Sequence, residues 1–167
     1  MQIASSVPRR SPRPSRAGLF ALTLLVAACS DDAPERRRAL GENPSFGDAI
    51  RVADAERGGR LFRACAACHT IGMGAGDRNG PGLYGVMGKP VAGNSRRFAY
   101  TGALRSLGGV WTPDRMDRWL AAPAKMAPGT SMTFRGVADP LDRADIIAFL
   151  QAQSVVGAGA AASPPRP

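Results

Sequence analysis

Three segments carry apolar residues at helical spacing, and each begins with a residue suited to cap a helix. The segments are residues 54–65, 112–120 and 139–153. The second opens with Thr112 followed by Pro113, a cap and then proline at the first helical position. The third carries one apolar stripe, which is typical of a helix with a single buried face. The pattern predicts an all-α domain with three to four main helices.

Between the first two predicted helices lies a glycine-rich stretch, residues 71–110, without a convincing strand pattern. A loop of this length is uncommon inside a compact domain. It is tolerable where the chain wraps a large, rigid, apolar object. We therefore expect long loops folded around such a group.

The two ends of the chain differ in composition from this central part. Residues 1–28 combine a basic start with an apolar run of twelve residues, 17–28. Because a helix needs ~20 residues to span a bilayer, we interpret this run as the core of an export signal. Residues 29–49, rich in charge, Pro and Gly, are expected to form a flexible tether, and residues 155–167 a disordered tail. The globular domain is expected over residues 50–154.

Cys29 directly follows the predicted signal, in Val26-Ala27-Ala28-Cys29. This segment resembles the lipobox of bacterial lipoproteins, where the cysteine thiol receives a diacylglyceryl group and becomes the new N-terminus. A plain signal peptide with an incidental cysteine is the alternative. A twin-arginine signal fits less well, because Arg9-Arg10 is followed by Ser-Pro-Arg-Pro. We expect a protein anchored by lipid at Cys29 on the periplasmic side of a bacterial membrane.

The formal charge indicates the kind of surface that the protein would bind. Removing the four arginines of the predicted signal lowers that charge from +9 to +5. A mildly basic surface favours an acidic partner or an anionic membrane. Nucleic acid is not expected, because clustered basic residues with interleaved aromatic residues are missing from the sequence.

The only histidine of the chain lies in Cys65-Ala66-Ala67-Cys68-His69. C-x-x-C-H is the attachment signature for c-type haem. Residues three and four apart share one face of a helix. Both thiols can therefore reach neighbouring vinyl groups of one porphyrin, and the imidazole of His69 can meet its iron. We expect one haem c, covalently attached through Cys65 and Cys68.

Other chemistries of a C-x-x-C pair fit less well. A thioredoxin-like dithiol would usually have Trp or Pro in the motif and a flanking strand. A zinc site needs four ligands, and the motif offers three. A disulfide between positions three apart on a helix is strained.

The function then depends on the other axial ligand of the iron, because His/Met ligation suits electron transfer. Met116 lies on an apolar helical stripe and is expected to pack in the core, and Met73 is too close to His69 to cross the porphyrin easily. Met126 and Met132 lie in a Pro/Gly-rich segment, and both stay open as candidates for the second axial ligand. The methionines that follow the motif are Met73, Met87, Met116, Met126 and Met132.

Several motifs, in the same order, resemble those of the mitochondrial-type class I cytochromes c, and together they cover roughly residues 54–153. Four loop or turn segments carry the resemblance: Asn79–Gly85 (G-P-x-L-x-G), Phe98–Thr101 (F-S-Y-T), Gly109–Trp111 (I-T-W) and Pro128–Phe134 (P-G-T-K-M-x-F). The terminal helices also match, with Gly58 and Phe62 in G-x-x-x-F and residues 142–150 in D-R-x-D-L-I-x-Y-L.

The resemblance implies the cytochrome c fold, with loops wrapped around one covalent haem, and it assigns roles to four residues. Met132 would ligate the iron opposite His69, and the carbonyl of Pro81 would accept a hydrogen bond from His69. Tyr100 and Trp111 would donate to a haem propionate. Met126 occupies a place where the family often has tyrosine, which leaves it as an alternative ligand under alkaline or denaturing conditions.

We therefore expect a monohaem electron carrier rather than an enzyme. Its donor would be a quinol–cytochrome c oxidoreductase or a periplasmic dehydrogenase, and its acceptor a terminal oxidase or reductase. The alternatives are a haem enzyme or gas sensor with a displaceable distal ligand, and a structural lipoprotein with a C-x-x-C disulfide.

Overall fold

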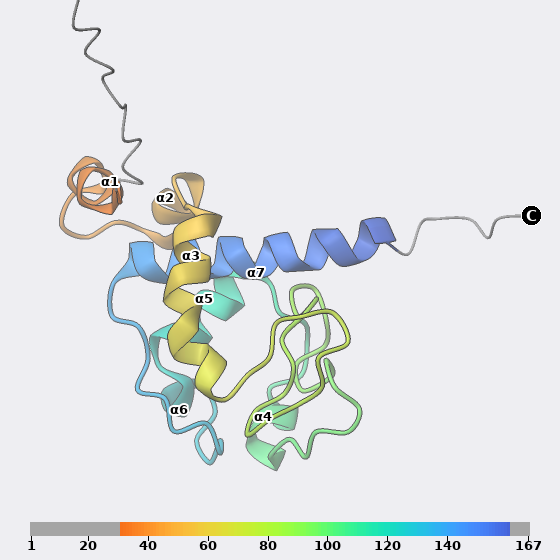
Figure 1. The fold of residues 1–167 in the computed structure, drawn as a ribbon. Coiled ribbons are helices and arrows are strands. Elements are labelled where there is room, and N and C mark those ends of the chain that lie inside the picture. Colours follow the sequence, from red (N-terminus) through yellow and green to blue (C-terminus); the bar gives the residue numbers. More distant parts are fainter. Residues whose placement is uncertain (1–30, 161–167) are drawn as a thin grey trace, which may run out of the picture. The chain divides into compact units, whose positions relative to one another are not determined.

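The computed structural model describes residues 31–160, with side chains described through Ser154 (Figure 1). The predicted export signal, Cys29 and the end of the predicted tail lie outside this range. Within it the regular structure is helical, and the only β feature of the described residues is an isolated bridge between Pro90 and Val110. The all-α prediction is confirmed. None of the helices in this range is both long and apolar enough to span a bilayer.

The helices follow one another along the described chain, with a long loop between the 3₁₀ helix η1 and α4. Their bounds are α1 (Ala33–Leu40), α2 (Phe46–Arg51), α3 (Ala55–Leu61), η1 (Phe62–Ala67), α4 (Gly102–Ser106), α5 (Pro113–Ala121), α6 (Pro123–Met126) and α7 (Pro140–Ala160).

The predicted capping residues begin the three main helices. The carboxylate of Asp54 accepts hydrogen bonds from the first amides of α3, and the hydroxyl of Thr112 accepts one from the amide of Arg115 in α5. Asp139 accepts from the amide of Leu141 at the start of α7. Each side chain satisfies backbone donors that a helix leaves unpaired at its N-terminus. α7 continues to Ala160, so the first part of the predicted tail is helical.

A close crossing of α3 and α7 forms the frame of the domain (Figure 1). A Cβ at Gly58 would lie 1.9 Å from the carbonyl oxygen of Asp145 and 2.9 Å from Cβ of Phe149. Phe62 and Phe149 pack against each other beside this point, with ring centroids 5.3 Å apart and ring planes tilted by 48°. The packing of Gly58 against the aromatic residue of the last helix, implied by the resemblance, is confirmed, and it explains a glycine inside a helix.

The segment expected as a flexible tether contains two helices, α1 and α2 (Figure 1). Arg36 on α1 donates to both carboxylate oxygens of Asp145 on α7, at 2.8 and 3.2 Å. Arg57 on α3 donates to the same carboxylate at 2.8 Å. We call residues 33–51 the N-terminal clamp. The charged composition that suggested a solvated tether instead supplies partners for carboxylates of α7.

The main core lies between α5, α7 and the loops that follow η1. Its buried members are apolar side chains drawn from α5, α7, η1 and those loops: Phe62, Val86, Val91, Trp111, Met116, Trp119, Leu120, Ala127, Ile146, Ile147 and Leu150. Several of these side chains, among them Trp111, Met116 and Trp119, also line the cavity of the candidate haem site.

Candidate haem site

A cavity of about 480 Å³ lies between η1, α5, α7 and the long loops. Its volume falls within the ~300–1,000 Å³ range of cofactor pockets, and its lining is mainly apolar. The cavity brings together every haem-site residue expected from the sequence: Cys65, Cys68, His69, Pro81, Tyr100, Trp111 and Met132. An apolar cavity with two thiols and an imidazole in its wall fits a haem attached through those thiols.

Cys65 lies in η1, and Cys68 is the residue that ends this helix. A 3₁₀ turn aligns residues three apart more directly than an α-helix does, which brings the two thiols to one side. No disulfide joins Cys65 to Cys68, so both sulfurs are available to attach a haem. Burial raises the pKa of Cys65, with a smaller contribution from Cys68. Among residues 31–160, no group of three or more His, Cys, Asp or Glu side chains is arranged to hold a metal ion, as a zinc site would require.

The ring of His69 is oriented by a backbone carbonyl. Its Nδ1 lies 2.8 Å from the carbonyl oxygen of Pro81. Because a carbonyl only accepts hydrogen bonds, Nδ1 carries the proton and Nε2 keeps its lone pair for a metal. Two backbone hydrogen bonds of 2.8 Å join residues 68–70 to residues 80–83. The amide of Gly80 donates to the carbonyl of Cys68, and the amide of Leu83 donates to the carbonyl of Thr70.

Gly80 is a site residue that the sequence reasoning missed. A Cβ at this position would lie 2.4 Å from Cε1 and 2.7 Å from Nδ1 of the His69 ring. The imidazole therefore packs flat against a backbone that tolerates no side chain. The glycine directly before Pro81 was visible in the motif, but only the fold reveals its contact with the ring.

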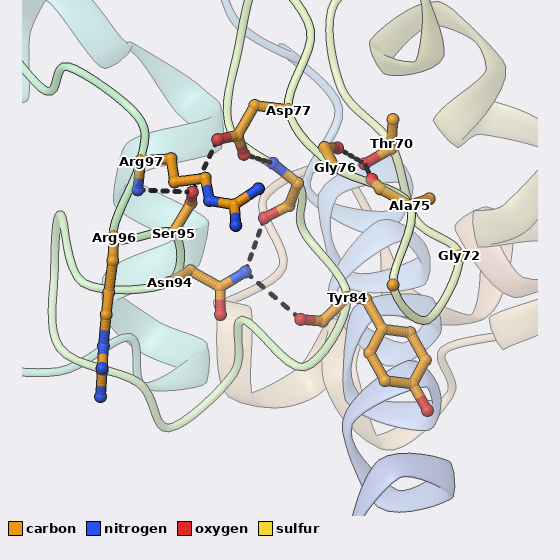
Figure 2. Close-up of a pocket in the computed structure, with 12 residues that line it drawn as sticks. Thr70, Gly72, Ala75, Gly76, Asp77, Tyr84, Asn94, Ser95, Arg96 and Arg97 are labelled. Carbon is orange, nitrogen blue, oxygen red and sulfur yellow. Dashed lines mark hydrogen bonds between the residues drawn. The ribbon is translucent and has the colours of Figure 1, made fainter.

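A second hydrogen-bonded network joins the segment around Asp77 to the segment around Ser95 within the long loop (Figure 2). The hydroxyl of Ser95 donates to one carboxylate oxygen of Asp77 at 2.6 Å, and the amide of Gly82 donates to the other at 2.8 Å. The side-chain amide of Asn94 donates to the carbonyls of Gly82 and Tyr84, at 2.6 and 3.3 Å. Residues far apart in the long loop are thereby joined next to the His69–Pro81 pair.

The two aromatic residues expected near the propionates both line the cavity. The hydroxyl oxygen of Tyr100 accepts from the amide of Ser95 at 3.1 Å, which leaves its own proton free to donate. Burial raises the pKa of Tyr100, so the hydroxyl stays protonated at neutral pH. Trp111 packs against Trp119, with ring centroids 5.6 Å apart, and its backbone pairs with Lys89.

Met132 lies on a loop that starts with a type II turn. The amide of Thr130 donates to the carbonyl of Ala127 at 3.0 Å, and Gly129 has φ +92°. Proline followed by glycine at the two central positions is the sequence signature of this turn. The hydroxyl of Thr130 then accepts from the amide of Met132 at 3.3 Å.

Two other methionines lie near this loop, and their environments differ. Met116 lines the cavity from α5 but is 4% exposed, inside the hydrophobic core. Met126, at the end of α6, packs against the core and is not among the residues that line the cavity.

The family model described as Cytochrome c matches residues 55–154. The chain belongs to the cytochrome c family. It therefore carries one haem c attached through Cys65 and Cys68, as members of the family do.

Similar proteins come from bacteria and plants. A cytochrome c homolog of Bradyrhizobium diazoefficiens is 37% identical over 105 residues, which cover 63% of this chain and 57% of that relative. The cytochrome c of Stellaria longipes is 42% identical over 103 residues, which cover 61% of this chain and 94% of the relative. Among solved structures, cytochrome cH from Methylobacterium extorquens matches with a TM-score of 0.57 and 37% identity, over 60% of this chain and 99% of that chain.

For a cytochrome c, the arrangement of the described side chains is suited to one-electron chemistry. Family membership makes the chain a haem electron carrier. The haem supplies the ferric/ferrous couple, while this chain supplies attachment, an apolar surrounding and a backbone carbonyl that accepts a hydrogen bond from the imidazole.

Proposed function

We propose that this cytochrome c transfers single electrons between redox partners at the periplasmic side of a bacterial membrane, with the haem iron ligated by His69 and Met132. The observation that carries this proposal is the cavity in which both side chains lie together with Cys65 and Cys68. His/Met ligation leaves no open position on the iron and raises its reduction potential. Both properties suit an electron carrier.

Met87 and Met126 are equally half buried but do not line the cavity, and Met116 lines it but is buried, so the combination of the two features favours Met132 as the distal ligand. Met132 lines the cavity, it is only half buried, and its loop is fixed by the turn at Pro128-Gly129. Met116 packs with Trp119 and Leu120 in the core and stabilises α5 there. Met126 is the weaker candidate, because its side chain lies outside the lining of the cavity.

The test uses the ferric charge-transfer band that a thioether ligand gives. We expect Met132→Ala to lose this band, while Met126→Ala and Met116→Leu keep it. Carbon monoxide should then bind rapidly to the ferrous Met132→Ala protein and slowly to the parent protein. A band that survives in Met132→Ala but disappears in either control variant would overturn the assignment. Rapid carbon monoxide binding by the parent protein would instead favour an open distal site.

The other residues of the proposed haem site would form hydrogen bonds with His69 or with a haem propionate. The carbonyl oxygen of Pro81 accepts a hydrogen bond from Nδ1–H of His69, which would fix the tautomer that presents Nε2 to the iron. Tyr100 and Trp111 would donate to a propionate, whose burial without donors would be costly. The proposed donors of electrons are a quinol–cytochrome c oxidoreductase or a periplasmic dehydrogenase, and the proposed acceptor is a terminal oxidase or reductase.

The proposed location is the periplasmic membrane surface, with a lipid on Cys29. The lipobox-like Val26-Ala27-Ala28-Cys29 and the apolar run before it support this proposal. Mass spectrometry of the native protein should find haem together with a diacylglyceryl-modified Cys29 at the N-terminus. Cys29→Ala should release the haem protein from membranes. An unmodified N-terminus in a membrane-free protein would contradict the anchor without affecting the ligation proposal.

A further inference from the structure

The peptide group between Pro81 and Gly82 is hydrogen-bonded at both of its ends. Its carbonyl oxygen, on Pro81, accepts from Nδ1 of His69 at 2.8 Å. Its N–H, on Gly82, donates to a carboxylate oxygen of Asp77, also at 2.8 Å. Because both bonds involve one planar, resonance-coupled group, a negative charge at the N–H end increases the electron density on the carbonyl oxygen.

Asp77 is built to stay ionised in this position. Its second carboxylate oxygen accepts from the hydroxyl of Ser95 at 2.6 Å (Figure 2). The hydrogen bond from Ser95, then that from the amide of Gly82, and more weakly the charge of Arg97, hold the pKa of Asp77 below its usual range. The side chain is half buried and points to the backbone amide of Gly82.

We propose that Asp77 is a positioning residue that tunes the haem iron through the Pro81–Gly82 peptide and the imidazole of His69. The proposal rests on the proposed role of His69 as an iron ligand. A carboxylate bonded to the peptide N–H makes Pro81 a stronger acceptor, and the stronger bond makes His69 a more basic ligand. A more basic ligand favours ferric over ferrous iron. Asp77 therefore lowers the reduction potential.

The loop geometry offers a way to separate this electronic role from a structural one. Backbone hydrogen bonds from Gly80 to Cys68 and from Leu83 to Thr70 hold Pro81 on either side, without Asp77. Asn94 also donates to the carbonyl of Gly82. An isosteric Asp77→Asn keeps an oxygen that can accept from the Gly82 amide. It removes the charge and leaves these other hydrogen bonds in place.

The experiment compares reduction potentials of the haem-loaded parent protein, Asp77→Asn, and two controls. Asp77→Asn should raise the potential, so that at the parent midpoint the ferrous-to-ferric ratio rises roughly threefold, or about 28 mV at ~59 mV per tenfold for one electron. Ser95→Ala keeps the charge of Asp77 and should give a potential at or below that of the parent. Asp114→Asn removes an exposed carboxylate from the first turn of α5 and should leave the potential unchanged.

A second readout follows the proposed path of the effect. In the diamagnetic ferrous protein, the proton resonances of His69 Nδ1–H and of the Gly82 amide should both move upfield in Asp77→Asn, because both hydrogen bonds weaken. The proposal stands only if the potential and both resonances shift. An unchanged potential overturns it, and so does a raised potential with an unshifted Nδ1–H, which would mean that the charge acts through space.

The charge-transfer band separates this proposal from the one on which it rests. If the band is present in the parent and in Asp77→Asn while the potentials agree, the ligation holds and the role of Asp77 fails. If the parent lacks the band, the His69/Met132 ligation itself fails.

Discussion

The crossing of α3 and α7 gives a prediction whose size can be worked from the structure, namely the effect of Gly58→Ala. The new Cβ would lie 1.9 Å from the carbonyl oxygen of Asp145 and 2.5 Å from its carbonyl carbon. Ordinary contact begins near 3.4 Å. Both obstructing atoms belong to the backbone of α7, so no side-chain rotation can relieve the overlap. The two helices must move apart.

Two effects of opposite sign set the magnitude. Alanine is favoured over glycine inside a helix by ~1 kcal/mol. Overpacking a tight core costs ~1–3 kcal/mol, and the upper end applies here because the obstacle is backbone. The net result is a loss of about 2 kcal/mol in the free energy of unfolding. For a domain of this size, that corresponds to a melting temperature lower by ~8 °C or more.

The assay is denaturant unfolding of the purified haem protein, followed by far-ultraviolet circular dichroism. Gly102→Ala is the matched control, because Gly102 begins α4 and a Cβ there would meet no atom within 4 Å. Its free energy of unfolding should stay within ~0.5 kcal/mol of the parent value. The reasoning fails if Gly58→Ala is as stable as Gly102→Ala, since the helix crossing would then have room that the structure does not give it.

Two further predictions concern the ion pairs of the N-terminal clamp. Arg36→Met removes two hydrogen bonds to the buried carboxylate of Asp145 and should lower the free energy of unfolding by about 2 kcal/mol. Arg38→Met, at an exposed position of the same helix, should lower it by less than ~0.5 kcal/mol. Hydrogen exchange of the α1 amides should accelerate only in the first variant, and equal exchange in both would contradict a docked α1. Burial opposes ionisation of Asp139, but hydrogen bonds from Arg37 and the amides that Asp139 caps outweigh it and lower its pKa. Stability from this group is therefore present above its ordinary pKa of 3.8 and is lost as the pH falls through the lowered value. Asp139→Asn, which keeps the cap, should flatten the decline of stability as the pH falls below 3.8 in acid titrations; an unchanged slope would count against the ion pair.

Local signals in the sequence were sufficient for the main helices and for the haem attachment. Asp54 and Thr112 cap helices through contacts within three residues, so no distant part of the chain is needed to predict them. The same holds for the type II turn before Met132. The spacing within Cys65–His69 also belongs to a single turn, and family membership confirms the covalent haem.

Contacts between distant segments could not be predicted in this way. The arginines of α1 lie more than a hundred residues from the carboxylates that they bind on α7. The charged composition of this segment is equally typical of a solvated linker and of a docked helix, and only the fold distinguishes these two structures. Gly80 and Asp77 were missed for a related reason, because their partners in the loop lie up to 18 residues away, without a periodic pattern between them.

The docked α1 changes what the proposed lipid anchor would do. Only three residues separate Cys29 from Ala33, the first residue of α1, so their Cα atoms lie at most ~14 Å apart. A free tether of about twenty residues would have a root-mean-square span of ~25 Å and a much longer maximum reach. Asp31, two residues after Cys29, forms an ion pair with Arg57 in the first turn of α3, while Cys65 and Cys68 follow at the other end of that helix and η1. With the clamp docked, a lipid on Cys29 would be linked to the folded α1 through three residues, instead of through a flexible tether of about twenty. The haem protein would then reach redox partners only within a short distance of the membrane. Release of α1 from α7 would extend that distance without any change in chain length.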